Sequence, residues 1–356
     1  MKYVQTVLGP IAPEEMGFTL PHEHILWDLS GHNPIKLDPA DQEDPRNQPL
    51  TMESLSELKF HLWEYKDNLV MQDPEVAVRE LQWFKKAGGG TICDNTTFEP
   101  RSPRKLQEIS RRTGVHVVLG TGTYVAGYMS PEHKAMDADE LAQVFIRELR
   151  QGVKDTDVKC GFIGEIGVDS GVPETSRLSL AAAAKAQKET GAAILIHQPG
   201  TEHQADTIFK ILTDNGGSLE RTVMCHCDPL LPDHDYIDHM AKSGAYISFD
   251  FFGLEAVLGM SLWLPTDRER ILAIREQIDR GNLKHIVMSH DTAYKCMLRR
   301  WGGFGYGHLP KNMVPMMLRM GYEQQWIDQI TKYNPQEIFA LEKAMLIPAR
   351  QLKQPQ

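Results

Sequence analysis

The sequence predicts an α/β protein of the (β/α)8 (TIM) barrel class, and three observations support this. Eight short apolar runs recur along the 356 residues, with helical patterns between them. Most of the helical segments end at or beside a glycine, as is typical of a helix C-terminus. Strands that alternate with helices of about 10–15 residues indicate parallel β-α units. Eight such units in a chain of this length favour a closed barrel.

The eight predicted strands are short and rich in apolar and β-branched residues. They span residues 18–25, 91–97, 115–124, 160–167, 192–199, 222–228, 245–252 and 285–291. The alternative is an open doubly wound sheet, which usually carries a glycine-rich phosphate loop after its first strand. Here the first strand leads into Pro-His-Glu-His instead, so we favour the barrel.

The segments between these strands have the apolar periodicity of helices. They include residues 77–90, 102–114, 139–152, 177–191, 204–217, 235–245 and 268–282. Residues 31–52 are rich in proline and aspartate and are expected to form a long loop over the barrel mouth. We predict a single barrel domain over residues 1–345 and a polar C-terminal tail over 346–356.

Composition excludes several classes of protein. The formal net charge is −10, with both signs mixed along the chain, which argues against a nucleic-acid partner. The N-terminus lacks the apolar core of a secretory signal, and no run approaches the ~20 apolar residues that cross a bilayer. The five cysteines form no C-x-x-C motif. We therefore expect reduced thiols in a cytoplasmic protein that acts on a small molecule and has no membrane partner.

The first predicted strand leads into two histidines one residue apart, His22 and His24. Because side chains alternate along an extended segment, both point to one face and Glu23 points to the other. Two imidazoles on one face pack poorly in a core but can bind a metal ion together. The alternative is a pair of half-buried loop histidines, so the assignment needs partners elsewhere in the chain.

Further metal-type ligands follow at the ends of other predicted strands. The full set is His22, His24, Glu165, His197, His226 and Asp291. Taken singly, each has an ordinary structural explanation, such as a core histidine or a helix cap. In a barrel, however, the C-terminal ends of all strands meet at one mouth, where active sites lie. Six such groups in one cavity would be costly without a cation, so the pattern predicts a metal site.

Six ligands exceed the needs of one catalytic zinc, which usually takes three protein ligands and a water. Two divalent ions that share a bridge fit the number better, and Glu165 can give one oxygen to each. We expect the pair to hold a bridging hydroxide as the nucleophile, with Asp291 as a ligand that also accepts its proton. Histidine and carboxylate ligands suit zinc, and also manganese, cobalt or iron.

These residues resemble the phosphotriesterase family of the amidohydrolase superfamily, in particular its phosphotriesterase-related branch. The similar segments are TVLGPI and FTLPHEHI near the start, GTGTY at 120–124, IGEIG at 163–167 and SHDTAYKCMLRRWGGFGYGH at 289–308. The resemblance covers about residues 4–342. It implies that His22, His24 and Asp291 hold the more buried ion. It implies also that His197 and His226 hold the more exposed ion, with Glu165 between the two.

Two positions depart from better-known members of this family. Many phosphotriesterases and lactonases bridge their metals with a carboxylated lysine, whereas this chain has Glu165, as in the phosphotriesterase-related branch. Lactonase-like relatives often have Asp-Arg where this chain has Asp250-Phe251. Loss of that cation removes a partner for a substrate phosphate or carboxylate. These departures count against efficient phosphotriester hydrolysis more than against metal binding.

The resemblance also suggests residues that contact substrate. Tyr124 corresponds to a tyrosine that related lactonases place near the metals, where a phenol can polarise a substrate oxygen. Phe251 and Trp301 suggest an apolar wall, although plain barrel packing explains Phe251 equally well. Lys295 lies in the loop after the last strand, which commonly shapes the leaving-group pocket.

The function that the sequence predicts is a binuclear metal-dependent hydrolase acting on a carboxylic ester or lactone. The same site would serve organophosphate triester hydrolysis or amide hydrolysis of an N-acyl compound, and these alternatives stay open. A non-enzymatic binding protein would be expected to lose a ligand, and all six positions are filled. A single-metal deaminase would need no bridging carboxylate. The family resemblance alone implies a homodimer.

Overall fold

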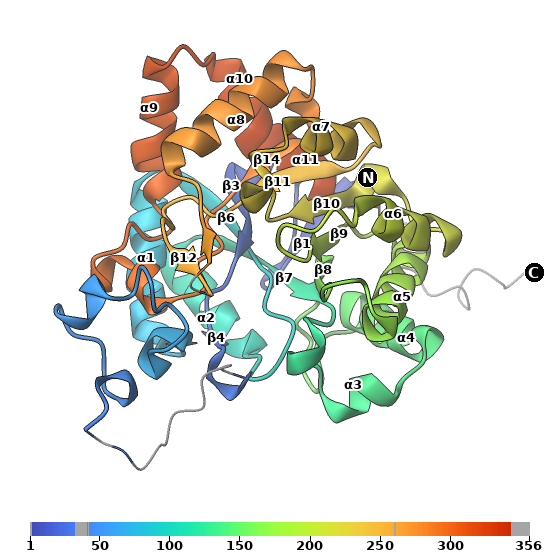
Figure 1. Ribbon diagram of the computed structural model, residues 1–356. Coiled ribbons are helices and arrows are strands. Elements are labelled where there is room, and N and C mark those ends of the chain that lie inside the picture. Colours follow the sequence, from blue (N-terminus) through green and yellow to red (C-terminus); the bar gives the residue numbers. More distant parts are fainter. Residues whose placement is uncertain (1, 33–40, 42, 260, 343–356) are drawn as a thin grey trace, which may run out of the picture.

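The computed structural model describes residues 2–32, 41, 43–259 and 261–342. The predicted tail at 346–356 and residues 33–40 and 42 of the predicted loop at 31–52 lie outside these residues. Eight parallel strands form one sheet in the order β14-β11-β10-β9-β8-β7-β6-β3, and helices surround it (Figure 1). The prediction of a (β/α)8 barrel is therefore confirmed.

The barrel strands follow the predicted runs closely. They are β3 (Phe18–Glu23), β6 (Gly89–Asp94), β7 (His116–Thr121), β8 (Phe162–Gly167), β9 (Ile194–His197), β10 (Thr222–Cys225), β11 (Tyr246–Phe249) and β14 (Ile286–Met288). Seven lie within the predicted ranges, and β6 begins two residues before its range. At the seam between β14 and β3, the His22 N–H donates to Ser289 Oγ (3.1 Å) and the Asp291 N–H donates to the His22 carbonyl (3.1 Å).

Helices connect consecutive strands on the outside of the barrel. These are α1 (Pro74–Lys86), α2 (Pro103–Thr113), α4 (Ala138–Arg150), α5 (Glu174–Thr190), α6 (Ala205–Asp214), α7 (His234–Lys242) and α8 (Asp267–Asp279). Shorter helices are α3 (Pro131–Ala135), α9 (Val314–Arg319), α10 (Gln324–Asp328) and α11 (Asn334–Phe339). Among the described residues, every helix is too short or too polar to cross a bilayer.

Local sequence explains where these helices begin and end. Asp73 caps α1 by accepting from the Glu75 N–H, and Pro74 occupies the first helical turn. Thr266 and Glu269 form a reciprocal capping box at the start of α8. Gly191 follows α5 in the left-handed conformation, which glycine adopts at little cost.

Three small sheets lie outside the barrel wall. The first joins β1 (Lys2–Thr6), β2 (Gly9–Ile11) and β15 (Leu341–Glu342). The others pair β4 (Trp27–Asp28) with β5 (Val70–Met71), and β12 (Val257–Leu258) with β13 (Leu262–Trp263). The first brings the two ends of the described chain together, since Lys2 pairs with Glu342.

The barrel interior is filled by side chains that consecutive strands contribute to one buried cluster. It includes Cys93, Val118, Phe162, Leu195, Val223, Tyr246 and Val287, one from each of the strands β6 to β11 and β14. A larger cluster packs the outer face of the strands against the helices. The barrel is therefore a packed core whose strand ends are fixed relative to one another, as a binding site requires.

Candidate metal centre

The six residues predicted as metal ligands lie together at the C-terminal ends of the barrel strands. His22 and His24 lie at the end of β3 and share one face, as strand alternation predicts. The His24 Nε2 atom lies 3.1 Å from Asp291 Oδ1, and His22 Nε2 lies 3.7 Å from the same oxygen. These three residues, from the first and last strands of the barrel, form one group of three potential ligands.

Glu165, on β8, lies between that group and a second one. Its Oε1 atom is 3.4 Å from His24 Nε2, and its Oε2 atom is 3.4 Å from His22 Nε2. On the other side, Oε2 is 3.1 Å from His197 Nδ1 and 3.7 Å from His226 Nε2. The His226 Nε2 and His197 Nδ1 atoms are 2.8 Å apart. One carboxylate thus faces histidines from β3 and histidines from β9 and β10.

The donor set fits a divalent cation. The buried Nε2 atom of His22 has no hydrogen-bond partner among the described residues, although it points into the cluster. Nitrogen and carboxylate oxygen atoms are the ligands of zinc and similar ions. Two groups, His22-His24-Asp291 and His22-Glu165-His226, each bring three such atoms within 4.8 Å of one another. His197 is the most accessible of the set, with 24% of its side chain exposed.

The charged groups of the cluster shift one another's pKa values in the direction that favours positive charge there. Burial alone would raise the pKa of the Glu165 carboxyl, but the charge of His22 and contacts with His197 hold that pKa well below its usual range. Burial would lower the pKa of His24, yet Asp291 and Glu165 outweigh it and raise the pKa to about 9. The carboxylates are therefore ionised at neutral pH, and their negative charge favours positive charge on the groups around them.

Polar contacts at Nδ1 orient the rings of His24 and His226. The His24 Nδ1 atom lies 3.1 Å from Thr96 Oγ1, and His226 Nδ1 lies 2.8 Å from Asp250 Oδ1. The second carboxylate oxygen of Asp250 is 3.3 Å from His22 Nδ1. Contacts of this kind fix the ring orientation and the tautomer of a ligating histidine, so that Nε2 is left to face the ion.

Glu23 lies between the two histidines in sequence and points the other way, toward the end of β14. Its carboxylate is fully buried and accepts from Ser289 Oγ (2.8 Å), the His290 N–H (2.9 Å) and the Thr292 N–H (2.9 Å). It also lies 2.7 Å from His290 Nδ1. These contacts fix the backbone on both sides of Asp291.

Two of the predicted substrate-contacting residues border the cluster. The ring of Tyr124 lies edge-on to His197 with centroids 4.8 Å apart, and burial raises the pKa of its phenol well above the ordinary value. The phenol is therefore a hydrogen-bond donor at neutral pH. Phe251 stacks on His226 at 4.7 Å and also packs with Leu62 and Met297 in a small buried cluster. Phe251 thus packs the loop that follows β11 and also borders the cluster.

The other two predicted substrate residues lie elsewhere. Lys295 forms an ion pair with Asp67, and its Nζ atom lies 5.2 Å from the centre of the Trp301 ring. Trp301 in turn packs against buried residues of the main core. The described contacts of Lys295 and Trp301 are thus with each other, with Asp67 and with the main core.

Sequence reasoning overlooked several residues that support the site. Strand alternation predicts only that Glu23 faces away from the histidines, and the sequence does not predict the contact between Thr96 and His24. The one local signal is a carboxylate, Glu23, that ends a buried strand, since such a group is rarely buried without partners. Its partners lie more than 260 residues away, so spacing alone could not reveal them.

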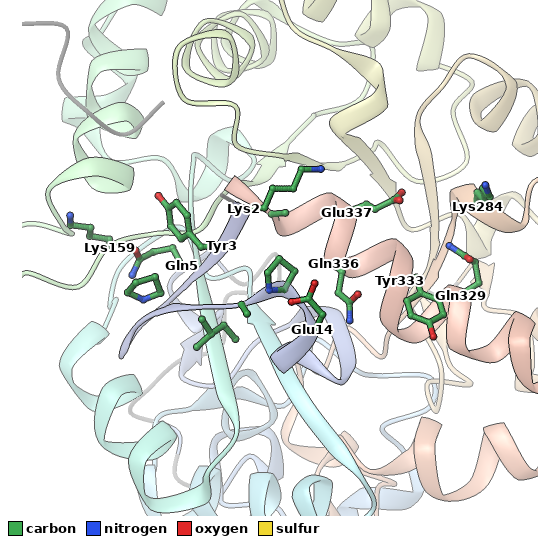
Figure 2. A pocket seen from close by; sticks show the side chains of 15 residues that line it. Lys2, Tyr3, Gln5, Glu14, Lys159, Lys284, Gln329, Tyr333, Gln336 and Glu337 are labelled. Atoms are coloured by element: carbon green, nitrogen blue, oxygen red, sulfur yellow. The ribbon is translucent and has the colours of Figure 1, made fainter. Parts of the chain in front are cut away.

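A cavity of about 1180 Å³ lies at the opposite end of the barrel. It is bordered by β1 and by residues that precede β8 and β14, such as Lys159 and Lys284. Figure 2 shows its lysine, glutamine and glutamate side chains spread along the groove, with Lys159 far from Lys284. They do not converge on one point, in contrast to the histidine cluster. The potential ligands that do converge therefore lie at the C-terminal mouth.

Comparison with known proteins places this chain among hydrolases. The model of the phosphotriesterase family matches residues 2–339. N-acetyltaurine hydrolase of Xenopus tropicalis is 37% identical over 340 residues, which cover 94% of this chain and 97% of that protein. The crystal structure of a resiniferatoxin-binding protein from Rhodobacter sphaeroides matches with a TM-score of 0.90 and 34% identity, over 95% of this chain and 94% of that one. A lactonase from Listeria monocytogenes, Lmo2620, matches with a TM-score of 0.76 and 25% identity, over 96% and 100% of the two chains.

Proposed function

Because the chain belongs to the phosphotriesterase family, we propose that it is a hydrolase with two divalent ions in the six-residue cluster. The observation that carries the proposal is the position of Glu165. Its two carboxylate oxygens face His24 on one side and His197 on the other, at 3.4 Å and 3.1 Å. A carboxylate in this position can give one oxygen to each of two ions. His22, His24 and Asp291 would hold one ion, and His197 and His226 the other.

When bound, such an ion pair supplies a nucleophile from water at neutral pH and polarises the oxygen of the scissile group. Residues of the chain supply a proton acceptor and a hydrogen-bond donor. Asp291, with 16% of its side chain exposed, faces the mouth and can accept the proton of the attacking water. The Tyr124 phenol can donate a hydrogen bond to the oxygen on which negative charge develops.

We propose the amide bond of an N-acyl compound as the substrate. This choice differs from the ester or lactone favoured by the sequence alone. The support comes from relatives at 35–37% identity named N-acetyltaurine hydrolase, of which the aligned region covers about 97%. A lactone is the second candidate, because the Listeria lactonase shares the fold over nearly the whole chain. Both reactions require the same nucleophile and the same polarised carbonyl.

The identity of the ions, the compartment and the assembly are further parts of this proposal. Zinc suits the mixed histidine and carboxylate ligands. The five cysteines are free thiols, four of them buried, which supports a reducing compartment such as the cytoplasm. A homodimer rests on the family resemblance.

A substrate panel tests the proposal. Protein loaded with zinc or manganese is assayed on N-acetyltaurine, N-acetyl amino acids, a series of lactones and an aryl dialkyl phosphate. Asp291→Asn, which keeps the shape of the side chain, is the matched control. We expect the highest kcat/KM on an N-acyl amide and its loss in the control. Turnover of lactones without any amide would favour the second candidate. Protein that carries two ions and hydrolyses none of these compounds would contradict the proposed activity.

A further inference from the structure

A buried arginine on the outer side of the barrel contacts the loop that supports the metal centre. Arg270, on α8, is 0% exposed. Its Nε atom donates to Asp228 Oδ1 (2.6 Å), Nη1 to Asp267 Oδ1 (2.8 Å) and Nη2 to the Leu254 carbonyl (2.9 Å). A buried guanidinium is costly unless all its sides are satisfied, and here three separate partners share it.

Asp228 connects this arginine to the backbone at the end of β11. Its Oδ2 atom accepts from the Asp250 N–H (2.9 Å), and its Oδ1 atom accepts from the Phe251 N–H (3.4 Å). Both carboxylates are fully buried. The position of Asp250 therefore depends on a carboxylate whose negative charge Arg270 balances.

Asp250 in turn holds His226. The His226 ring nitrogen Nδ1 lies 2.8 Å from Asp250 Oδ1, and the His226 N–H donates to the same oxygen at 3.0 Å. His226 has a φ of 59°, a conformation that non-glycine residues rarely adopt. The contacts with Asp250 offset this strain and turn Nε2 toward Glu165. A continuous buried series, Arg270-Asp228-Asp250-His226, thus ends at a proposed metal ligand.

The same arginine also fixes the far end of the loop. Asp267, which Arg270 contacts, accepts from the Gly253 N–H (2.9 Å) and lies 2.6 Å from His308 Nε2. Residues 250–254 are therefore held at their start through Asp228 and at their end through Asp267 and Leu254. The loop cannot shift without breaking contacts with Arg270.

We propose that Arg270 is a positioning residue for the metal centre, acting through Asp228 and Asp250 on His226; this inference rests on the proposed two-metal function. It touches neither substrate nor ion. Lysine cannot replace it, because an ammonium is a point charge and lacks the planar fork that reaches both carboxylates and the carbonyl together.

The test compares metal affinity in Arg270→Lys and Asp228→Asn with that of wild-type protein. Arg275→Lys is the matched control, since Arg275 lies on the same helix and is 39% exposed. Dissociation constants for zinc are measured by competition with a chromophoric chelator, and the visible spectrum of cobalt-loaded protein reports the ligand geometry. Urea denaturation of the metal-free variants shows whether the fold is retained.

We expect both variants to remain folded and to bind the more weakly held ion about tenfold less tightly or worse, with an altered cobalt spectrum. The control is expected to match wild type. A folded Arg270→Lys protein with wild-type affinity and spectrum would overturn the inference. Loss of folding in both variants would also overturn it, because the contacts of Arg270 with Asp228 and Asp267 would then support the whole barrel. If wild-type protein binds no metal, the proposed function fails first, so the two failures are distinguishable.

Discussion

At the scale of single residues, two of the proposed ligands have strained backbones that buried carboxylates hold in place. His226 and Asp291 have φ values of 59° and 48°, which cost about 1–3 kcal/mol each for a non-glycine residue. Asp250 accepts from the backbone of His226, and Glu23 accepts from the backbone on both sides of Asp291. Such strain is common where a side chain must point into a functional site.

The role of Glu23 leads to a specific prediction. In Glu23→Gln the side chain loses its charge, and its amide group meets backbone donors where a carboxylate accepted from them. We expect a loss of about 2 kcal/mol in the free energy of unfolding and weaker metal retention against a chelator. Urea denaturation and metal analysis measure the two effects. Glu14→Gln, on the far side of the barrel, is the control, and equal behaviour of the two variants would refute this role.

Tyr124 leads to a second prediction. Tyr124→Phe removes the phenol but keeps the ring that packs beside Phe98 and His197. We expect the metal content to stay unchanged and kcat/KM on the hydrolysed substrate to fall about 100-fold, the typical effect of removing one donor to a developing oxyanion. If Tyr124→Phe retains full activity, the phenol has no part in the reaction.

At the scale of elements, the loops that follow the strands are fixed by buried ion pairs behind them. After β6, Arg101 forms an ion pair with Glu148 (2.8 Å) and donates to the Gly120 carbonyl (2.6 Å), and its side chain is only 7% exposed. Thr121 Oγ1 also donates to Glu148 (2.6 Å). This network holds the loop that begins with Thr96, a partner of His24, against the outer wall of the barrel.

This network predicts a contrast between two arginines. Arg101→Met leaves Glu148 as an uncompensated buried charge, so we expect a loss of about 3–5 kcal/mol in the free energy of unfolding. Arg112, on the surface of α2, pairs with Glu75 while 37% of its side chain is exposed. Arg112→Met should therefore cost far less, because water screens an exposed ion pair. Denaturation curves for the two variants test the contrast, and similar losses would contradict it.

The elements that carry the site were well predicted from sequence, and the reasons are local. The eight barrel strands are mostly apolar, potential ligands lie at the ends of five of them, and helices separate them. The β1–β2 hairpin and β15 were not predicted, because they are short and pair residues as distant as Lys2 and Glu342. Contacts such as those of Arg270 and Glu23 escaped prediction for the same reason: they join segments that only the closed barrel brings together.

At the scale of the whole molecule, the proposed ligands come from five strands spread between β3 and β14. They meet only when the barrel is closed, so the unfolded chain presents no comparable site. Any ion that binds the cluster must therefore stabilise the folded state by mass action. The contacts that close the barrel between β3 and the end of β14 involve the backbones of His22 and Asp291, two of the proposed ligands.

Metal removal should therefore destabilise the protein measurably. With free ion at about 100 times its dissociation constant, each bound ion adds about 2.7 kcal/mol to the free energy of unfolding. We expect Tm to fall after exhaustive chelation and to recover when zinc or manganese is restored. A Tm that chelation leaves unchanged, in protein shown to have lost its metal, would mean that the ions do not bridge the strands.

The central claim is that Glu165 bridges two ions, and the most direct measurement is the metal content per chain of wild-type protein and of Glu165→Ala. Glu108→Ala, whose side chain is 64% exposed on α2, is the control for loss of a glutamate. Our account predicts close to two divalent ions in wild-type and control protein, and a clear loss in Glu165→Ala. One ion or fewer in metal-supplied wild-type protein, unaffected by Glu165→Ala, would contradict the two-metal centre.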